Sequence, residues 1–78
     1  MISTVNMKRA EQEIRRDYDR AKEARFWELY DYEGDEATLE KEECAVILVS
    51  VIENAQDRLK LSDAQSGKLL AKLVEELL

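Results

Sequence analysis

The side chains of this sequence that can take part in chemistry are carboxylates, one thiol and no imidazole. The chain holds a single cysteine, Cys44, and no histidine, so it lacks a histidine-activated nucleophile and the ligands for a closed cysteine and histidine zinc site. Carboxylate pairs such as Glu40 with Glu43 share one helical face, but no histidine is present to transfer protons near neutral pH. We therefore expect no catalytic activity and no cofactor.

A run of aromatic and acidic residues in the middle of the chain is the strongest candidate for a working surface. Four of the five aromatic residues fall within seven positions: Phe26, Trp27, Tyr30 and Tyr32. Carboxylates begin in the same segment, at Glu28, Asp31, Glu33, Asp35 and Glu36. Rings rimmed by charge are typical of protein interfaces, because a ring buries a large area while few torsions are frozen. We expect the rings to anchor a protein partner and the carboxylates to steer its basic surface.

The same residues have plainer interpretations. On a helix, Phe26, Trp27 and Tyr30 project away from the apolar stripe that runs from Met7 to Leu29. The rings can therefore plug the end of a helical hairpin or pack under a third helix instead of meeting a partner. The carboxylates can equally form a solvated acidic turn.

The charge is unevenly distributed. Residues 8–25 carry seven basic and five acidic side chains, a local net charge of +2, whereas residues 28–43 carry eight acidic side chains and one lysine, a local net charge of −7. The whole chain has a net charge of −6. Such an acidic patch disfavours nucleic acid and anionic membranes and favours a basic protein surface. Direct nucleic-acid binding through the basic residues is not expected, because acids on the same helix offset them. One alternative is an acidic nucleic-acid mimic that blocks a DNA- or RNA-binding protein.

The spacing of four acids invites comparison with a calcium-binding loop. Asp31, Glu33, Asp35 and Glu42 occupy positions 1, 3, 5 and 12 of a twelve-residue stretch. Position 6, where such a loop needs glycine for its sharp turn, holds Glu36, and the glycine stands two positions earlier. The sequence therefore does not predict a calcium site.

The pattern of apolar residues and breakers predicts an all-α fold in a single domain, residues 1–78. Proline is absent, and only Gly34 and Gly67 interrupt residues that favour helices. We expect helices at about 7–33, 36–60 and 63–78, with Asn6 and the Ser62 and Gln65 capping box as N-terminal signals and Gly34 as a stop. Asp35 or Thr38 is expected to cap the second helix. The predicted architecture is a long antiparallel helical hairpin with a short C-terminal helix, similar to a three-helix bundle.

Two features of the second helix leave questions open. Its centre, Cys44 to Ile52, is apolar on most sides and rich in β-branched residues, so a buried strand is the alternative. A helix of this kind must be covered all round, and the other two helices offer narrow covers. We therefore expect a homodimer whose interface uses part of the second or third helix, and the rival function is a self-assembling structural module.

No long apolar stretch marks a secretory signal or a membrane span, so we expect a cytoplasmic protein. Compact, highly charged single-domain chains of this size are common among accessory proteins of phages and mobile elements. The sequence as a whole thus predicts a small, acidic, non-catalytic adaptor, inhibitor or regulator.

Overall fold

The computed structural model describes residues 6–78, and within them three α-helices follow one another along the chain. Helix α1 spans Met7–Glu33, α2 spans Lys41–Leu59 and α3 spans Asp63–Leu77, with a short 3-10 turn, η1, at Gly34–Glu36. The predicted helical hairpin with a short C-terminal helix is confirmed. None of these helices combines the length and the apolar character needed to cross a lipid bilayer.

Local signals in the sequence set most of the helix ends. The side chain of Asn6 accepts a hydrogen bond from the backbone N–H of Arg9, as an N-cap does. Ser62 and Gln65 form the predicted capping box, each side chain accepting from the other residue's backbone N–H. Gly34 ends α1 with a φ of +63°, a conformation that L side chains rarely adopt.

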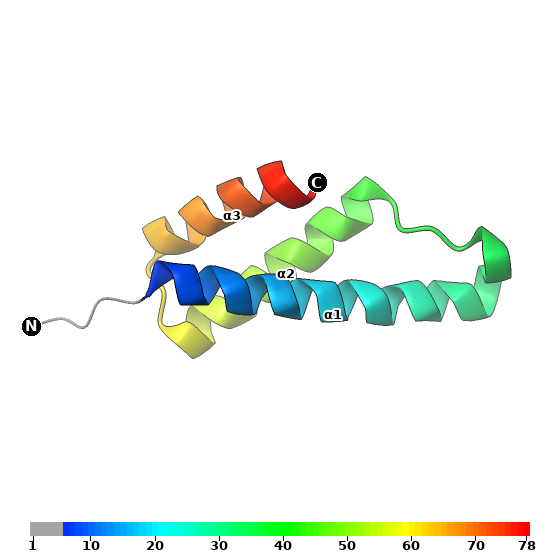
Figure 1. Ribbon diagram of the computed structural model, residues 1–78, viewed down its shortest axis with the longest axis horizontal. Helices are drawn as coiled ribbons and strands as arrows, with labels where there is room; N and C mark the ends of the chain where they lie inside the picture. The colour runs from blue at the N-terminus through cyan, green and yellow to red at the C-terminus, as the bar shows by residue number, and fades with distance from the viewer. Residues whose placement is uncertain (1–5) are drawn as a thin grey trace, which may run out of the picture.

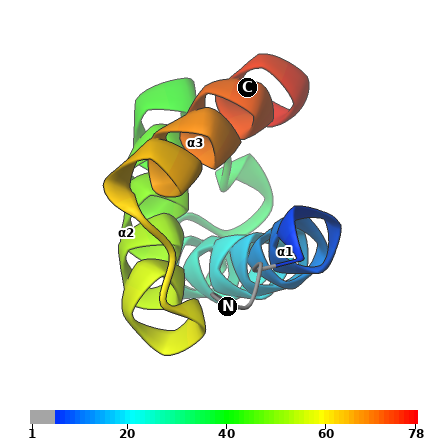
Figure 2. The same ribbon diagram turned by 90° about the vertical axis from the view of Figure 1, so that its left-hand side faces the viewer.

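The core lies between the three helices. Figure 2, viewed along α1, shows α2 on one side, α1 on the other and α3 across the top. Its fully buried side chains include Ile14 and Tyr18 of α1, Leu48 of α2 and Leu73 of α3. The predicted apolar faces of all three helices therefore meet in one cluster.

Ion pairs connect the helices around this core. Arg58 of α2 donates to Asp17 of α1 at 2.7 Å, and Lys72 of α3 lies 2.7 Å from a carboxylate oxygen of Glu11. The hydrogen bond from Lys72 lowers the pKa of Glu11 and outweighs the opposing effect of desolvation. These pairs hold the first half of α1 against both other helices.

The second helix differs from its prediction at its start. It begins at Lys41 rather than at residue 36, and its N-cap is Glu40, whose side chain makes no capping hydrogen bond, so neither Asp35 nor Thr38 caps it. The stretch between η1 and α2 is extended, and Ala37 and Leu39 are partly buried while Thr38 and Glu40 are exposed. In extended backbone, every second side chain points to the same side. Ala37 and Leu39 can therefore both pack inward. The strand alternative for Cys44 to Ile52 is wrong, because this segment is helical.

Candidate functional site

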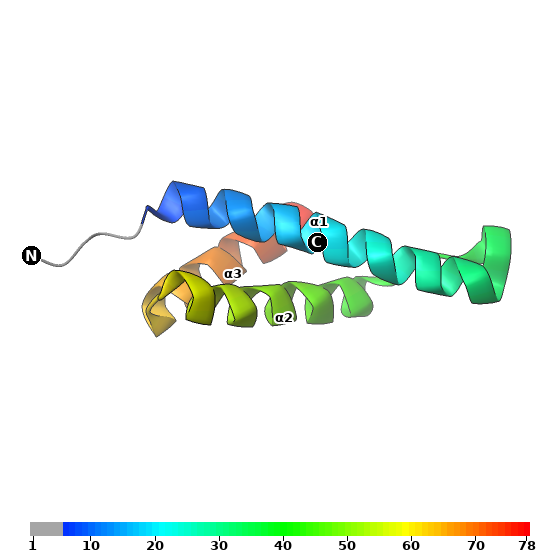
Figure 3. The ribbon, with the colours of Figure 1, turned by 90° about the horizontal axis from the view of Figure 1, so that it is seen from below.

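The last turns of α1 extend beyond the body of the molecule. Helix α1 has 27 residues and α2 has 19, and the buried residues of α1, Ala10, Ile14 and Tyr18, all lie in its first half. Figures 1 and 3 show from two directions that the C-terminal end of α1 runs past the start of α2. No other helix of the described chain covers this end, which carries the candidate residues.

Three of the four predicted aromatic anchors form one group, here termed the aromatic cluster: Phe26, Trp27 and Tyr30. The ring centroids of Phe26 and Trp27, and those of Trp27 and Tyr30, are 5.4 Å apart in edge-to-face contact. Phe26 and Tyr30 are 6.2 Å apart. Trp27 is 53% exposed and Tyr30 39% exposed, whereas Phe26 is partly buried. Because each ring packs on its neighbours, the cluster presents one continuous apolar surface.

Tyr32 stands apart from this cluster. It is 93% exposed, although its position on the helix lies on the same side as the buried Ile14 and Tyr18. The reason is the overhang of α1, since α2 begins too late to reach it. Tyr32 is therefore an isolated exposed ring and not part of the aromatic cluster.

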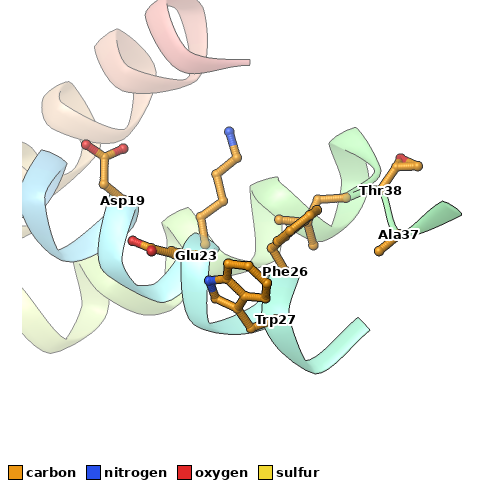
Figure 4. A pocket seen from close by; sticks show the side chains of 8 residues that line it. Asp19, Glu23, Phe26, Trp27, Ala37 and Thr38 are labelled. Atoms are coloured by element: carbon orange, nitrogen blue, oxygen red, sulfur yellow. The ribbon is translucent and has the colours of Figure 1, made fainter. Parts of the chain in front are cut away.

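An open groove runs beside the aromatic cluster, and it is here termed the α1 groove. It has a volume of about 550 Å³, and α1 and the extended segment before α2 form its walls. Figure 4 shows Phe26 and Trp27 between Glu23 on one side and Ala37 and Thr38 on the other. Its lining residues are Asp19, Lys22, Glu23, Phe26, Trp27, Ala37, Thr38 and Leu39.

The predicted acidic residues divide into paired and unpaired groups. Arg25 donates to Glu43 of α2 and, at 3.0 Å, to Glu28, and these hydrogen bonds raise the pKa of Arg25. Glu28 therefore shares the positive charge of Arg25 with Glu43. Asp35 accepts a long hydrogen bond of 3.4 Å from the hydroxyl of Tyr30.

The remaining predicted carboxylates are free of internal cations. Asp31, Glu33 and Glu36 are exposed, and no lysine or arginine among residues 6–78 forms a salt bridge with them. The acidic charge that surrounds the end of α1 is thus available to an outside partner.

Sequence reasoning missed the residues that complete the groove. Asp19 and Glu23 share the face of α1 that carries Phe26 and Trp27, since they lie three to eight positions earlier, and that spacing was a usable signal. Ala37 and Leu39 were not recognised as groove residues, because the second helix was expected to begin at residue 36. Only the extended backbone observed there makes these residues a wall of the groove.

The other candidate chemistry gains no support from its surroundings. Cys44 is buried at 6% exposure, in keeping with a small core hydrophobe. Among residues 6–78 no group of three or more acidic or cysteine side chains is arranged to hold a metal ion. Of the basic residues in the segment 8–25, Arg15 and Arg25 are held by carboxylates of the chain itself.

No family model matches the chain, and neither the search of curated proteins nor that of solved structures found a match. Its function is therefore inferred from its own residues and their geometry.

Proposed function

We propose that this chain is a non-catalytic protein that binds another protein through the end of α1, as a small adaptor, inhibitor or regulator. The observation that carries the proposal is the exposed aromatic cluster, whose Trp27 is 53% exposed although all three rings are in mutual contact. A continuous apolar surface of this kind loses little conformational entropy on binding. The partner has a basic surface, because unpaired carboxylates surround the rings.

The two parts of this surface have different roles in binding. Tryptophan and tyrosine are enriched among the few interface residues whose truncation to alanine costs about 2 kcal/mol or more, on the order of a thirtyfold change in affinity. Exposed carboxylates such as Asp31, Glu33 and Glu36 contribute less to affinity and more to the association rate, in a salt-dependent way. The rings thus mainly set the dissociation rate of the complex, and the carboxylates mainly set its association rate.

The proposal is tested by affinity capture from a host lysate with matched variants. Wild type is compared with a Trp27→Ala, Tyr30→Ala double variant and with a Glu53→Ala control, which shortens an exposed side chain of α2 outside both proposed surfaces. We expect the same protein to be retained by wild type and by the control and to be lost with the double variant. Retention of every captured protein by the double variant would refute this role for the aromatic cluster.

Self-association is a second candidate, supported by apolar side chains outside the core. Val46 is 65% exposed, Val49 39% and Val74 40%, on the two helices expected to carry a homodimer interface. A 78-residue chain without a disulfide gains stability from burying such a surface against a second copy. Sedimentation equilibrium tests this: a dimer is expected for wild type and a monomer for Val46→Asp, whereas a mass of 9.1 kDa for wild type at micromolar concentration would exclude the dimer.

A further inference from the structure

The α1 groove combines an apolar floor with an unbalanced acidic rim. Phe26, Trp27, Ala37 and Leu39 supply the apolar surface, and Asp19 and Glu23 supply carboxylates. Its volume of about 550 Å³ falls within the range of roughly 300–1,000 Å³ that small-ligand sites occupy. The groove is therefore large enough to hold one bulky side chain together with a neighbouring polar group.

Within the described residues, the two carboxylates on the rim lack the internal ion pairs that several other acids of α1 make. Glu11, Glu13, Asp17 and Glu28 of α1 each lie within 4 Å of an arginine or lysine of the same chain. Asp19 and Glu23 have no such partner among residues 6–78. A cation brought by a ligand would therefore meet carboxylates that no internal ion pair occupies.

The one lysine of the groove does not neutralise this rim completely. The ammonium of Lys22 lies 5.8 Å from the centroid of the Tyr18 ring, at the distance of a cation–π contact. One lysine against two carboxylates leaves the lining with a net charge of −1. The groove therefore attracts a cation and repels an anion.

We propose that the α1 groove binds a basic segment of the partner protein, in which one bulky apolar side chain stands next to an arginine or lysine. The apolar side chain packs between Phe26 and Leu39. The cation reaches Glu23, which lies one turn before Phe26 on α1, about 5 Å along the helix axis. A guanidinium in this position can also lie over an aromatic face while it pairs with the carboxylate. This inference rests on the proposed function and specifies what the partner presents.

The test uses three small probes with the intact protein in solution. Phenethylguanidinium carries a phenyl ring two carbons from a cation, phenethyl alcohol is its neutral counterpart and 3-phenylpropionate its anionic counterpart. Binding is followed by ¹H–¹⁵N NMR at the indole N–H of Trp27 and at the backbone amides of residues 19–27 and 37–39. We expect saturable millimolar binding of the cation, at least fivefold weaker binding of the alcohol and none of the anion. Equal responses to cation and anion, or shifts that lie elsewhere, would overturn the proposal.

Matched variants test the contributions of the acidic rim and of the apolar floor to binding separately. Glu23→Gln is expected to weaken phenethylguanidinium binding at least threefold and to leave the alcohol unchanged, whereas Leu39→Ala is expected to weaken both. The control is Glu53→Gln, which removes an exposed acid of α2 and is expected to change neither. Unchanged cation binding by Glu23→Gln would refute the assigned site.

Failure of this inference and failure of the proposed function give different results. If lysate capture depends on Trp27 and Tyr30 but the cation probe does not bind, the partner uses the rings without the groove, and the inference is wrong. If the cation probe binds as expected but no captured protein depends on Trp27 and Tyr30, the groove chemistry stands and the proposed role of the aromatic cluster is wrong.

Discussion

Replacement of Tyr18 by phenylalanine tests the energetics of the core most directly. Tyr18 is 2% exposed, and its hydroxyl has no hydrogen-bond partner among the described residues. A buried hydroxyl without a partner costs roughly 1–3 kcal/mol. Tyr18→Phe removes that hydroxyl and keeps the ring under Lys22. We therefore expect the variant to be more stable than wild type by about 1 kcal/mol at pH 8.

The same hydroxyl makes stability depend on pH in the alkaline range. Burial, together with the neighbouring Cys44 thiol, raises the pKa of Tyr18 from 10.0 to about 12. Below pH 10 the hydroxyl is protonated in both the folded and the unfolded chain. As the pH rises from 10 to 12, the unfolded chain loses this proton and the folded chain retains it, so the free energy of unfolding falls. Once the pH exceeds both values, the difference between a pKa of 10.0 in the unfolded chain and about 12 in the folded chain corresponds to about 2.7 kcal/mol of lost stability.

The measurement is urea unfolding followed by circular dichroism at pH 8, 9, 10, 11 and 12 for wild type and Tyr18→Phe. Groups that titrate in both proteins, such as Lys72, cancel in the difference between their free energies of unfolding. We expect the advantage of Tyr18→Phe to grow by about 2 kcal/mol between pH 10 and pH 12. Tyr32→Phe is the matched control, because Tyr32 is 93% exposed and its replacement is expected to leave the pH profile unchanged.

Two results would contradict this reasoning. A difference between wild type and Tyr18→Phe that stays constant from pH 8 to 12 would mean that the folded state does not hold the proton. A loss of more than about 1 kcal/mol in Tyr18→Phe at pH 8 would mean that the hydroxyl has a stabilising partner.

Three further substitutions are read out by the same urea unfolding. Gly67→Ala is expected to stabilise the protein by about 0.5–1 kcal/mol, because a Cβ at this helical position meets no atom within 4 Å; a loss of stability would contradict the open space there. Gly34→Ala is expected to destabilise by about 1–3 kcal/mol, because φ is +63° at this residue, and an unchanged stability would argue against that turn. Leu48→Ala, at a fully buried position, is expected to cost about 2–5 kcal/mol through lost contacts and the cavity left behind, whereas a cost below about 1 kcal/mol would place Leu48 outside the core.

The sequence predicted those parts of the fold that local interactions determine. Asn6, Ser62 and Gln65 act within three residues of the helix ends that they cap, so their signals can be read without knowledge of the tertiary structure. The period of the apolar residues likewise identified the buried face of α1. Helix propensity and flanking residues also decided correctly between helix and strand for Cys44 to Ile52.

The start of α2 could not be predicted because tertiary packing determines it. On a helix, Ala37 and Leu39 would point to nearly opposite sides, and Glu36 and Glu40 would form a like-charged pair one turn apart. The extended segment lets Ala37 and Leu39 both line the groove beside Phe26 and Trp27. This packing depends on α1 projecting beyond α2, which no short stretch of sequence reveals. The groove was missed for the same reason.

The distribution of ion pairs divides α1 into two parts, and the second carries the aromatic cluster of the proposed partner surface. From Glu11 to Arg25 its charged side chains pair repeatedly with α2 and α3 and stabilise the fold. Beyond Arg25 the helix carries the aromatic cluster and, apart from Glu28, carboxylates without internal cations among the described residues, and Trp27, Tyr30 and Tyr32 remain exposed. Loss of stability and loss of binding should therefore be separable by mutation. Variants at Trp27 and Tyr30 test the proposed partner surface in a protein whose core, centred on Ile14 and Leu48, remains intact.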